Sequence, residues 1–229
     1  MCRDWRPSPV NEHVVATPTA RSPVQSRIHR AALGLYAEKG SSQITVSELA
    51  AAAGIARNTI YNNFASPEAL FETVAAVLVN EMNERVSATF DAAEDPARWL
   101  ANGMRFYLRR AHEEPQWGRF VVGFGLANAG LQQLWSGPPT ADVLLGIERG
   151  RYRISADQVL GAMAMIAGTV LASMLLVLEG HRTWRDAGTD AADLVLRGMG
   201  LSEEEACAIA RSELPPLPDL PAKARRVSG

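Results

Sequence analysis

The sequence predicts an all-α fold of about nine to ten helices, built as a three-helix N-terminal domain followed by a larger helical bundle. Apolar residues recur at three- and four-residue spacing along most of the chain, and no segment alternates apolar and polar residues as a strand would. Glycine and proline divide these periodic stretches into segments of ordinary helix length. Apolar residues make up 47% of the 229 residues, which is enough for a sizeable core.

The N-terminal segment predicts an arm and then a first helix. Residues 1–21 are rich in proline and charge and lack the apolar run of a secretory signal, so we expect a disordered arm. Ser22 can cap a helix whose first turn accepts Pro23, and Gly40 is a typical helix stop. A helix is therefore predicted between these signals.

Two short helices separated by a glycine are predicted next. Thr45 and Glu48 have the spacing of a capping box, and Gly54 breaks the apolar run that follows, because glycine adopts a sharp turn at little steric cost. A third helix is expected over about residues 56–64. Two short helices around a tight turn are the minimal helix-turn-helix, whose second helix can enter the major groove of DNA.

The remaining helices are predicted from their start and stop signals. Ser66 caps a long fourth helix with Pro67 in its first turn, and the apolar period continues to about residue 90. Further helices are expected at about 96–112, 115–128, 139–149, 155–179, 188–199 and 203–212. The expected organisation is a helix-turn-helix domain over 22–66, a second domain over 67–212 and a disordered tail over 213–229.

The third predicted helix has the composition of a DNA-reading surface. Arg57 can donate two hydrogen bonds to guanine, Asn58 can pair with adenine, and the methyl group of Thr59 can contact thymine. The polar residues that follow can reach phosphates or bases: Tyr61, Asn62 and Asn63. Ile60 and Phe64 are four residues apart and are expected to pack inward. A solvated polar helix within a bundle is the alternative interpretation.

Residues 24–82 contain a set of spaced residues that forms a specific pattern. It consists of the Ala31-Ala32 to Tyr36-Ala37-Glu38-Lys39-Gly40 run, Ile44-Thr45-Val46, Leu49-Ala50, Ala53-Gly54-Ile55, Thr59-Ile60-Tyr61, Phe64, and Ser66 with Glu68-Ala69-Leu70. This pattern resembles the DNA-binding domain of the tetracycline-repressor (TetR) family over about a quarter of the chain. The remainder resembles the family weakly, chiefly at residues 146–152, which precede a long apolar helix.

The resemblance implies a DNA-binding site at the helix-turn-helix. Thr45 would lie against the DNA backbone, the three residues that begin the third helix would face bases, and Tyr61 would contact a phosphate. The resemblance also implies a transcriptional repressor that binds operator DNA. The arm before Ser22, with Arg21, would reach a minor groove or phosphates, unless it is only a mobile tail.

The sequence departs from the family pattern at three positions. Ala56 replaces the usual Ser or Thr cap, which leaves the start of the recognition helix less well fixed. Asn58 stands where glycine is frequent and is expected to read a base that relatives ignore. Pro67 replaces a lysine that often contacts phosphate, which should lower the salt dependence of binding by about one phosphate contact.

The second domain is expected to hold two such modules together. One module makes too few DNA contacts for tight binding, so a homodimer on paired half-sites is expected. The helix at 155–179 is apolar all round and is expected to be buried, whereas that at 188–199 has one apolar face with Leu194 and Val195. The resemblance implies that these two helices from each subunit form a four-helix interface.

Residues 96–135 are unusually aromatic, and apolar pockets with a few polar groups are how such domains bind small molecules. The candidate ligand-binding residues are Trp99, Phe106, Trp117, Phe120, Phe124 and Met163. The alternative is that these residues only build the core. We expect a small apolar or aromatic effector, whose binding shifts the spacing of the two DNA-binding heads through the fourth helix.

A helical membrane-associated protein is the alternative function. Residues 159–178 carry no charge over the length that spans a bilayer. The segment is rich in small residues and lacks flanking aromatic anchors, which favours a helix of a soluble bundle and predicts no membrane partner. The net charge of −2 does not favour nucleic-acid binding, but residues 21–64 are net positive.

The sequence contains no motif that predicts an enzyme. There is no phosphate-binding glycine loop, no His-Glu-x-x-His and no Gly-x-Ser-x-Gly. Cys2 and Cys207 lie at opposite ends of the chain without metal-ligand spacing. We therefore expect no catalysis, no cofactor, no metal site and no disulfide framework, and a cytoplasmic location.

Overall fold

The computed structural model describes residues 23–64, 66–90 and 95–218, and within these ranges it contains α-helices and one 3-10 helix but no strands. The elements are α1 (Pro23–Lys39), α2 (Val46–Ala53), α3 (Arg57–Tyr61), α4 (Pro67–Ser87), α5 (Pro96–Glu113), α6 (Pro115–Phe124), α7 (Ala129–Ser136), α8 (Pro138–Glu148), η1 (Ala156–Gln158), α9 (Val159–Leu178), α10 (Trp184–Gly198) and α11 (Glu203–Ala210). The all-α prediction is confirmed. The predicted arm over 1–21 and most of the predicted tail lie outside the described residues.

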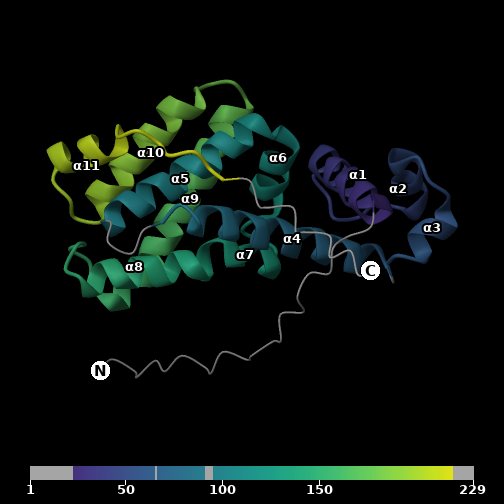
Figure 1. Cartoon of the computed structure of the whole chain (residues 1–229), viewed down its shortest axis with the longest axis horizontal. Helices are drawn as coiled ribbons and strands as arrows, with labels where there is room; N and C mark the ends of the chain where they lie inside the picture. Colours follow the sequence, from purple (N-terminus) through teal and green to yellow (C-terminus); the bar gives the residue numbers. More distant parts are fainter. Residues whose placement is uncertain (1–22, 65, 91–94, 219–229) are drawn as a thin grey trace, which may run out of the picture.

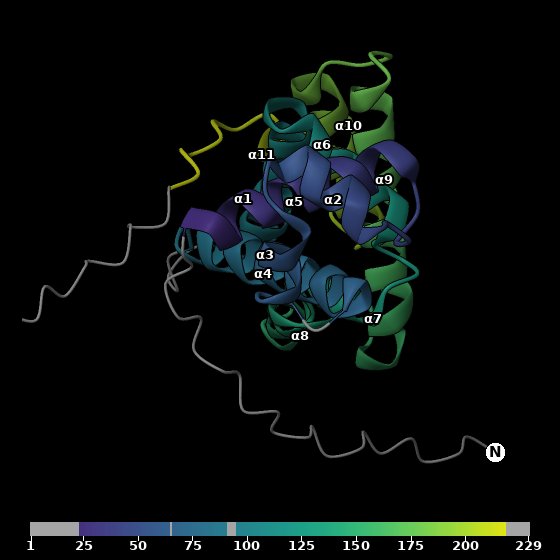
Figure 2. The ribbon, with the colours of Figure 1, turned by 90° about the vertical axis from the view of Figure 1, so that its right-hand side faces the viewer.

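The molecule is elongated, with α1, α2 and α3 at one end and the larger bundle at the other (Figure 1). The view along the long axis shows the three N-terminal helices in front of the bundle (Figure 2). The long helix α4 runs from beside α3 into the bundle, where it packs against α7. One continuous helix therefore connects the two parts.

Helix α5 is the centre of the bundle. It contacts α6, α8, α9, α10 and α11, and its buried residues lie all around its circumference. Asp95 caps its first turn by accepting a hydrogen bond from the N–H of Ala97, and Pro96 occupies the first helical position. Arg151 holds the same carboxylate through two hydrogen bonds of 2.6 and 2.7 Å, which ties the start of α5 to the loop after α8.

An aromatic cluster joins the N-terminal helices to the bundle. Tyr36 of α1 is fully buried and packs edge-on against Phe71 of α4, with ring centroids 4.9 Å apart. Phe71 in turn contacts Phe120 and Phe124 of α6 at 5.4 and 5.1 Å. The small domain and the bundle thus share one apolar core, since one cluster of buried residues spans both.

Two predicted helices differ from those observed. The segment predicted as one helix over 115–128 ends at Phe124, and α7 follows where no helix was predicted. Asn128 starts α7 because its side-chain oxygen accepts a hydrogen bond from the N–H of Leu131 at 2.9 Å. Similarly, the helix predicted at 188–199 begins earlier, at Trp184, where the Thr183 hydroxyl caps the N–H of Asp186.

Candidate nucleic-acid interface and effector cavity

The capping box predicted at the start of α2 is present. The N–H of Glu48 donates to Thr45 Oγ1 at 3.2 Å, and the N–H of Thr45 donates to Glu48 Oε2 at 2.9 Å. Lys39 Nζ lies 2.6 Å from Glu48 Oε1. The hydrogen bond from Lys39, followed by those from Thr45, lowers the pKa of the Glu48 carboxyl to about 2. These contacts bind the end of α1 to the start of α2.

The turn between α2 and α3 depends on Gly54. Its φ of 61° lies in the left-handed region, which a residue with a Cβ enters only with strain. Its N–H bonds back to the end of α2, and Arg27 Nη2 donates to its carbonyl at 3.2 Å. The start of α3 is consequently anchored by backbone contacts, although Ala56 provides no side-chain cap.

Helix α3 turns one face inward and one face to solvent. Ile60 is buried, and Phe64 packs against His29 of α1, with ring centroids 5.6 Å apart. The residues that face solvent are Arg57, Asn58, Tyr61 and Asn62, and the exposed fraction of Tyr61 is 63%. Helix α3 stands at the outer end of the molecule, away from the bundle (Figure 1). This arrangement leaves an exposed polar edge of the right size to meet a DNA groove.

The other three predicted DNA-contacting residues are partly buried or are hydrogen-bonded within the protein. Thr59 and Asn63 are half-buried, and Asn63 Nδ2 donates to the Thr59 carbonyl at 2.7 Å, which closes the end of α3. Thr45 is exposed, but its hydroxyl also donates to Glu48 Oε2 at 2.9 Å. The side chains of Asn63 and Thr45 therefore already have protein partners in the absence of DNA.

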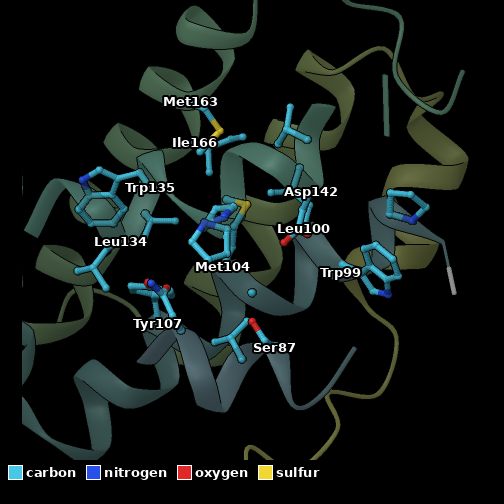
Figure 3. Close-up of a pocket in the computed structure, with 18 of the residues that line it drawn as sticks. Ser87, Trp99, Leu100, Met104, Tyr107, Leu134, Trp135, Asp142, Met163 and Ile166 are labelled. Atoms are coloured by element: carbon cyan, nitrogen blue, oxygen red, sulfur yellow. The ribbon is translucent and has the colours of Figure 1, made fainter. Parts of the chain in front are cut away.

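The bundle contains an apolar cavity of about 70 Å³ between α4, α5, α7, α8 and α9 (Figure 3). Its walls are mostly aromatic or aliphatic, and they include Trp99, Leu100, Met104, Tyr107, Trp135, Met163 and Ile166. Burial raises the pKa of the Tyr107 hydroxyl well above its ordinary value. A lining of apolar and aromatic side chains with a few polar groups is typical of sites that bind small molecules.

Part of the predicted ligand-binding set lines this cavity. Trp99 and Met163 line the cavity, but four other candidates do not: Phe106, Trp117, Phe120 and Phe124. Phe106, Trp117 and Phe120 are almost completely buried, and Phe124 belongs to the aromatic cluster around Phe71. These four are core residues. The cavity-lining residues that were not predicted from the sequence include Met104, Tyr107, Trp135 and Asp142.

A buried arginine links α4 to α5. Arg110 is 3% exposed, and its Nη2 lies 2.8 Å from Glu81 of α4. Its Nε lies 3.1 Å from Glu114, and its guanidinium lies over the ring of Trp117, 4.6 Å from the centroid. Because this side chain holds both helices at once, displacement of α5 is expected to move α4.

One face of α9 remains exposed, contrary to the expectation that the whole helix is buried. Among the described helices, the segment Ala156–Leu178 is long and apolar enough to cross a bilayer, yet only 39% of its most apolar window is buried. The large apolar side chains exposed on α9 and α10 are Leu160, Met165, Leu175, Leu176 and Leu194. Such a contiguous exposed apolar face marks an interaction surface.

A helix-turn-helix with an exposed second helix, continuous with a helical bundle, is the architecture of a class of DNA-binding regulators. Two family profiles agree with this class. Residues 28–74 match the bacterial regulatory proteins of the tetR family, and residues 95–212 match the tetracyclin repressor-like C-terminal domain. The chain belongs to the TetR family. It is thus a DNA-binding transcription regulator and not an enzyme.

Individual relatives are consistent with this assignment. The HTH-type transcriptional repressor DhaR of Mycobacterium sp. (strain GP1) is 31% identical over 84 residues, which are 36% of this chain and 42% of DhaR. The nucleoid occlusion factor SlmA of Vibrio cholerae is 26% identical over 92 residues, which are 40% of this chain and 47% of SlmA. The chain thus matches less than half of the length of these curated relatives.

Solved structures resemble the chain over most of its length. RolR in complex with resorcinol superposes with a TM-score of 0.66 at 27% identity, over 85% of this chain and 96% of RolR. FadR from Bacillus subtilis in complex with stearoyl-CoA superposes with a TM-score of 0.65 at 21% identity, over 76% of this chain and 98% of FadR. At that lower identity the second likeness shows the fold alone.

Proposed function

We propose that the protein is a ligand-responsive repressor, released from a palindromic operator by a small apolar or aromatic molecule that binds in the cavity. The observation that carries this proposal is the path of α4. The helix begins next to α3, at Pro67, and its far end provides Asn83, Val86 and Ser87 to the cavity wall. A ligand that repositions α4 would therefore reposition the recognition helix.

The exposed edge of α3 supports the proposed DNA contacts. Arg57 and Asn58 begin the helix and are solvent-exposed, so they can donate to guanine and pair with adenine in a major groove. The half-buried Thr59 presents a methyl group for thymine. Tyr61, Asn62, Asn63 and Thr45 are assigned to the DNA backbone or to flanking bases.

The exposed apolar face on α9 and α10 supports a homodimer. A second copy that covers this face would give a four-helix interface and would carry two α3 helices at a fixed separation. Burial of this face in a dimer would also explain why a soluble, cytoplasmic protein contains a helix as apolar as a membrane span, because the apolar face would not contact water. Expression without detergent separates this proposal from the membrane-associated alternative.

The cavity lining supports an apolar or aromatic effector. Aromatic side chains from α5 and α7 form much of its wall, and few polar groups interrupt it. The relative with the higher identity, RolR, was solved with the single-ring compound resorcinol, and FadR with the fatty-acyl compound stearoyl-CoA.

The ion pair between Arg110 and Glu81 provides a second connection from α5 to α4.

Selection of bound sequences from random DNA duplexes tests the DNA-binding part of the proposal. The expected result is a consensus with two-fold symmetry, since a symmetric dimer presents two identical helices. A consensus without a repeated half-site would contradict the dimeric arrangement.

The effector part is tested with a broad library of apolar and aromatic compounds. Each compound is scored for the midpoint of thermal unfolding and for release of the selected operator. A true effector changes both, because it must bind the two conformations with different affinities. If no compound changes both, the protein is not controlled through this cavity.

A further inference from the structure

The wall of the effector cavity contains one charged side chain among the described residues, Asp142 of α8. It is half-buried, and it lines the same cavity as Leu100 and Met104 (Figure 3). No residue that the structure describes donates a hydrogen bond to Asp142 or forms an ion pair with it. Loss of solvent alone raises the pKa of this carboxyl.

An unpartnered carboxylate is unusual in such a place. A polar group removed from water costs free energy unless it forms hydrogen bonds, and an ionised group costs more than a neutral one. Two other half-buried carboxylates are paired: Asp95 with Arg151, and Glu81 with Arg110. The half-buried Asp142 therefore keeps its acceptors free for a bound molecule, and the buried Nε1–H of Trp99 in the same cavity wall is a donor that also lacks a hydrogen-bond partner.

We infer that Asp142 is a specificity-determining residue, and that the effector is a ring-containing molecule that donates a hydrogen bond to it. The inference rests on the proposed function, because it concerns the ligand of the same cavity. Hydroxyl and ammonium groups share this chemistry. Phenols donate through a neutral O–H, whereas arylalkylamines donate as cations that also suit the surrounding aromatic faces of Trp99, Tyr107 and Trp135.

The same geometry excludes two kinds of molecule. A ring with only ether oxygens brings acceptors to Asp142 and leaves its carboxylate unsatisfied. A molecule whose carboxylate would lie beside Asp142 adds a like charge in a site of low dielectric constant. Ring compounds without a donor, and those with an acid group, should therefore bind poorly.

Four single-ring probes test the inference on the full-length protein without DNA. Resorcinol and benzylamine carry donors, 1,3-dimethoxybenzene carries only acceptors in a resorcinol-like arrangement, and benzoate carries a negative charge. Thermal-shift titrations give the affinity of each. Resorcinol, benzylamine or both should bind at least about 10-fold more tightly than dimethoxybenzene and benzoate, the factor that one hydrogen bond to a charged group supplies.

Two variants assign the selectivity to Asp142. Asp142→Leu keeps the approximate shape of the side chain and removes the acceptor. The affinity for the donor probes should therefore fall about 10-fold, whereas the affinity for dimethoxybenzene should not fall. Asp142→Asn keeps a neutral acceptor, so it should weaken the binding of benzylamine more than the binding of resorcinol.

Without ligand, neither variant should lower the unfolding midpoint, because no described partner of Asp142 is lost. If Asp142 had a purely structural role, both variants would lower the midpoint. Glu148→Gln, an exposed acid on the same helix, is the control and should bind like wild type.

Three results would overturn the inference. Dimethoxybenzene could bind wild type as tightly as the donor probes, the donor probes could bind Asp142→Leu unchanged, or neither donor probe could bind wild type. None of these results affects operator selection, so failure here is distinct from failure of the regulatory proposal. Preference for benzylamine over resorcinol, or the reverse, would identify which donor group the site accepts.

Discussion

Arg57 is an exposed cation in the first turn of α3, without an ion-pair partner among the described residues. If it donates two hydrogen bonds to a guanine, Arg57→Ala should weaken operator binding by about 1–3 kcal/mol and relax one position in each half-site. Binding to the selected operator and to single-base variants of it measures both effects. Arg119→Ala, an exposed arginine of α6, is the control and should change neither. Equal weakening on every sequence would instead make Arg57 a phosphate contact.

Glu48 makes the stability of the α1–α2 junction depend on pH. Its folded pKa of about 2 lies below the ordinary value of 4.5, so its contribution is complete above pH 4.5 and is lost as the pH falls towards 2. Glu48→Gln keeps the capping hydrogen bond and removes the charge that Lys39 stabilises. The variant should unfold at lower urea than wild type at pH 7, and the difference should shrink between pH 4.5 and 2. A difference that is independent of pH would show that Lys39 does not stabilise the carboxylate.

At the residue scale, the exposed edge of α3 was predictable and the cavity was not. Ile60 and Phe64 are four residues apart in a short helix, so one exposed edge follows directly from the sequence. In α5, buried residues occur all around the helix, and its periodicity does not indicate which side faces empty space. Phe106 and Tyr107 are adjacent and both buried, yet only Tyr107 lines the cavity. That difference depends on how α4 and α8 pack, which is not encoded locally.

At the element scale, helix starts with a strong capping signal were predicted well. Thr45 and Ser66 each accept the expected hydrogen bond from the third helical N–H. The break before α7 was missed because the cap signal of Asn128 stands alone, without a glycine or proline beside it to end the preceding helix. The domain boundary at residue 66 remains a prediction, since α4 passes through it and the aromatic cluster around Phe71 joins both sides.

The contact between α8 and the loop before η1 depends on Gly146. A Cβ at this position would lie 2.2 Å from Cε2 of Tyr152, which itself lines the cavity. Gly146→Ala should therefore destabilise the fold by about 1–3 kcal/mol, the usual cost of overpacking, and should displace Tyr152. Chemical denaturation measures the cost.

Gly123→Ala is the matched control for this substitution. Gly123 is exposed in α6, and a Cβ there meets no atom within 4 Å. Because alanine favours helix over glycine, this variant should be more stable than wild type by about 0.5–1 kcal/mol. If both variants changed stability in the same direction, the proximity of Tyr152 would not be the cause.

At the scale of the whole molecule, the exposed apolar face of α9 and α10 is expected to be buried against another molecule. Leu160, Leu175 and Leu194 are each between 47% and 68% exposed, on two helices that pack against each other. Close approach of a second copy is possible because small residues, Ala164 and Gly168, lie exposed on the same helix α9. A homodimer buries this face and at the same time supplies the second recognition helix that a palindromic operator needs.

Leu194→Glu tests the dimer directly. The two-fold symmetry of a dimer would place two such carboxylates in an apolar interface, and each buried charge without a partner costs several kcal/mol. The variant should therefore sediment as a monomer at concentrations where wild type is a dimer. It should also lose operator binding, since one module makes too few contacts, while its helical circular dichroism stays unchanged. Leu126→Glu is the control, because Leu126 is 63% exposed against 60% for Leu194 but lies between α6 and α7. If Leu194→Glu remained a dimer, or if Leu126→Glu dissociated to the same extent, the face on α9 and α10 would not be the subunit interface.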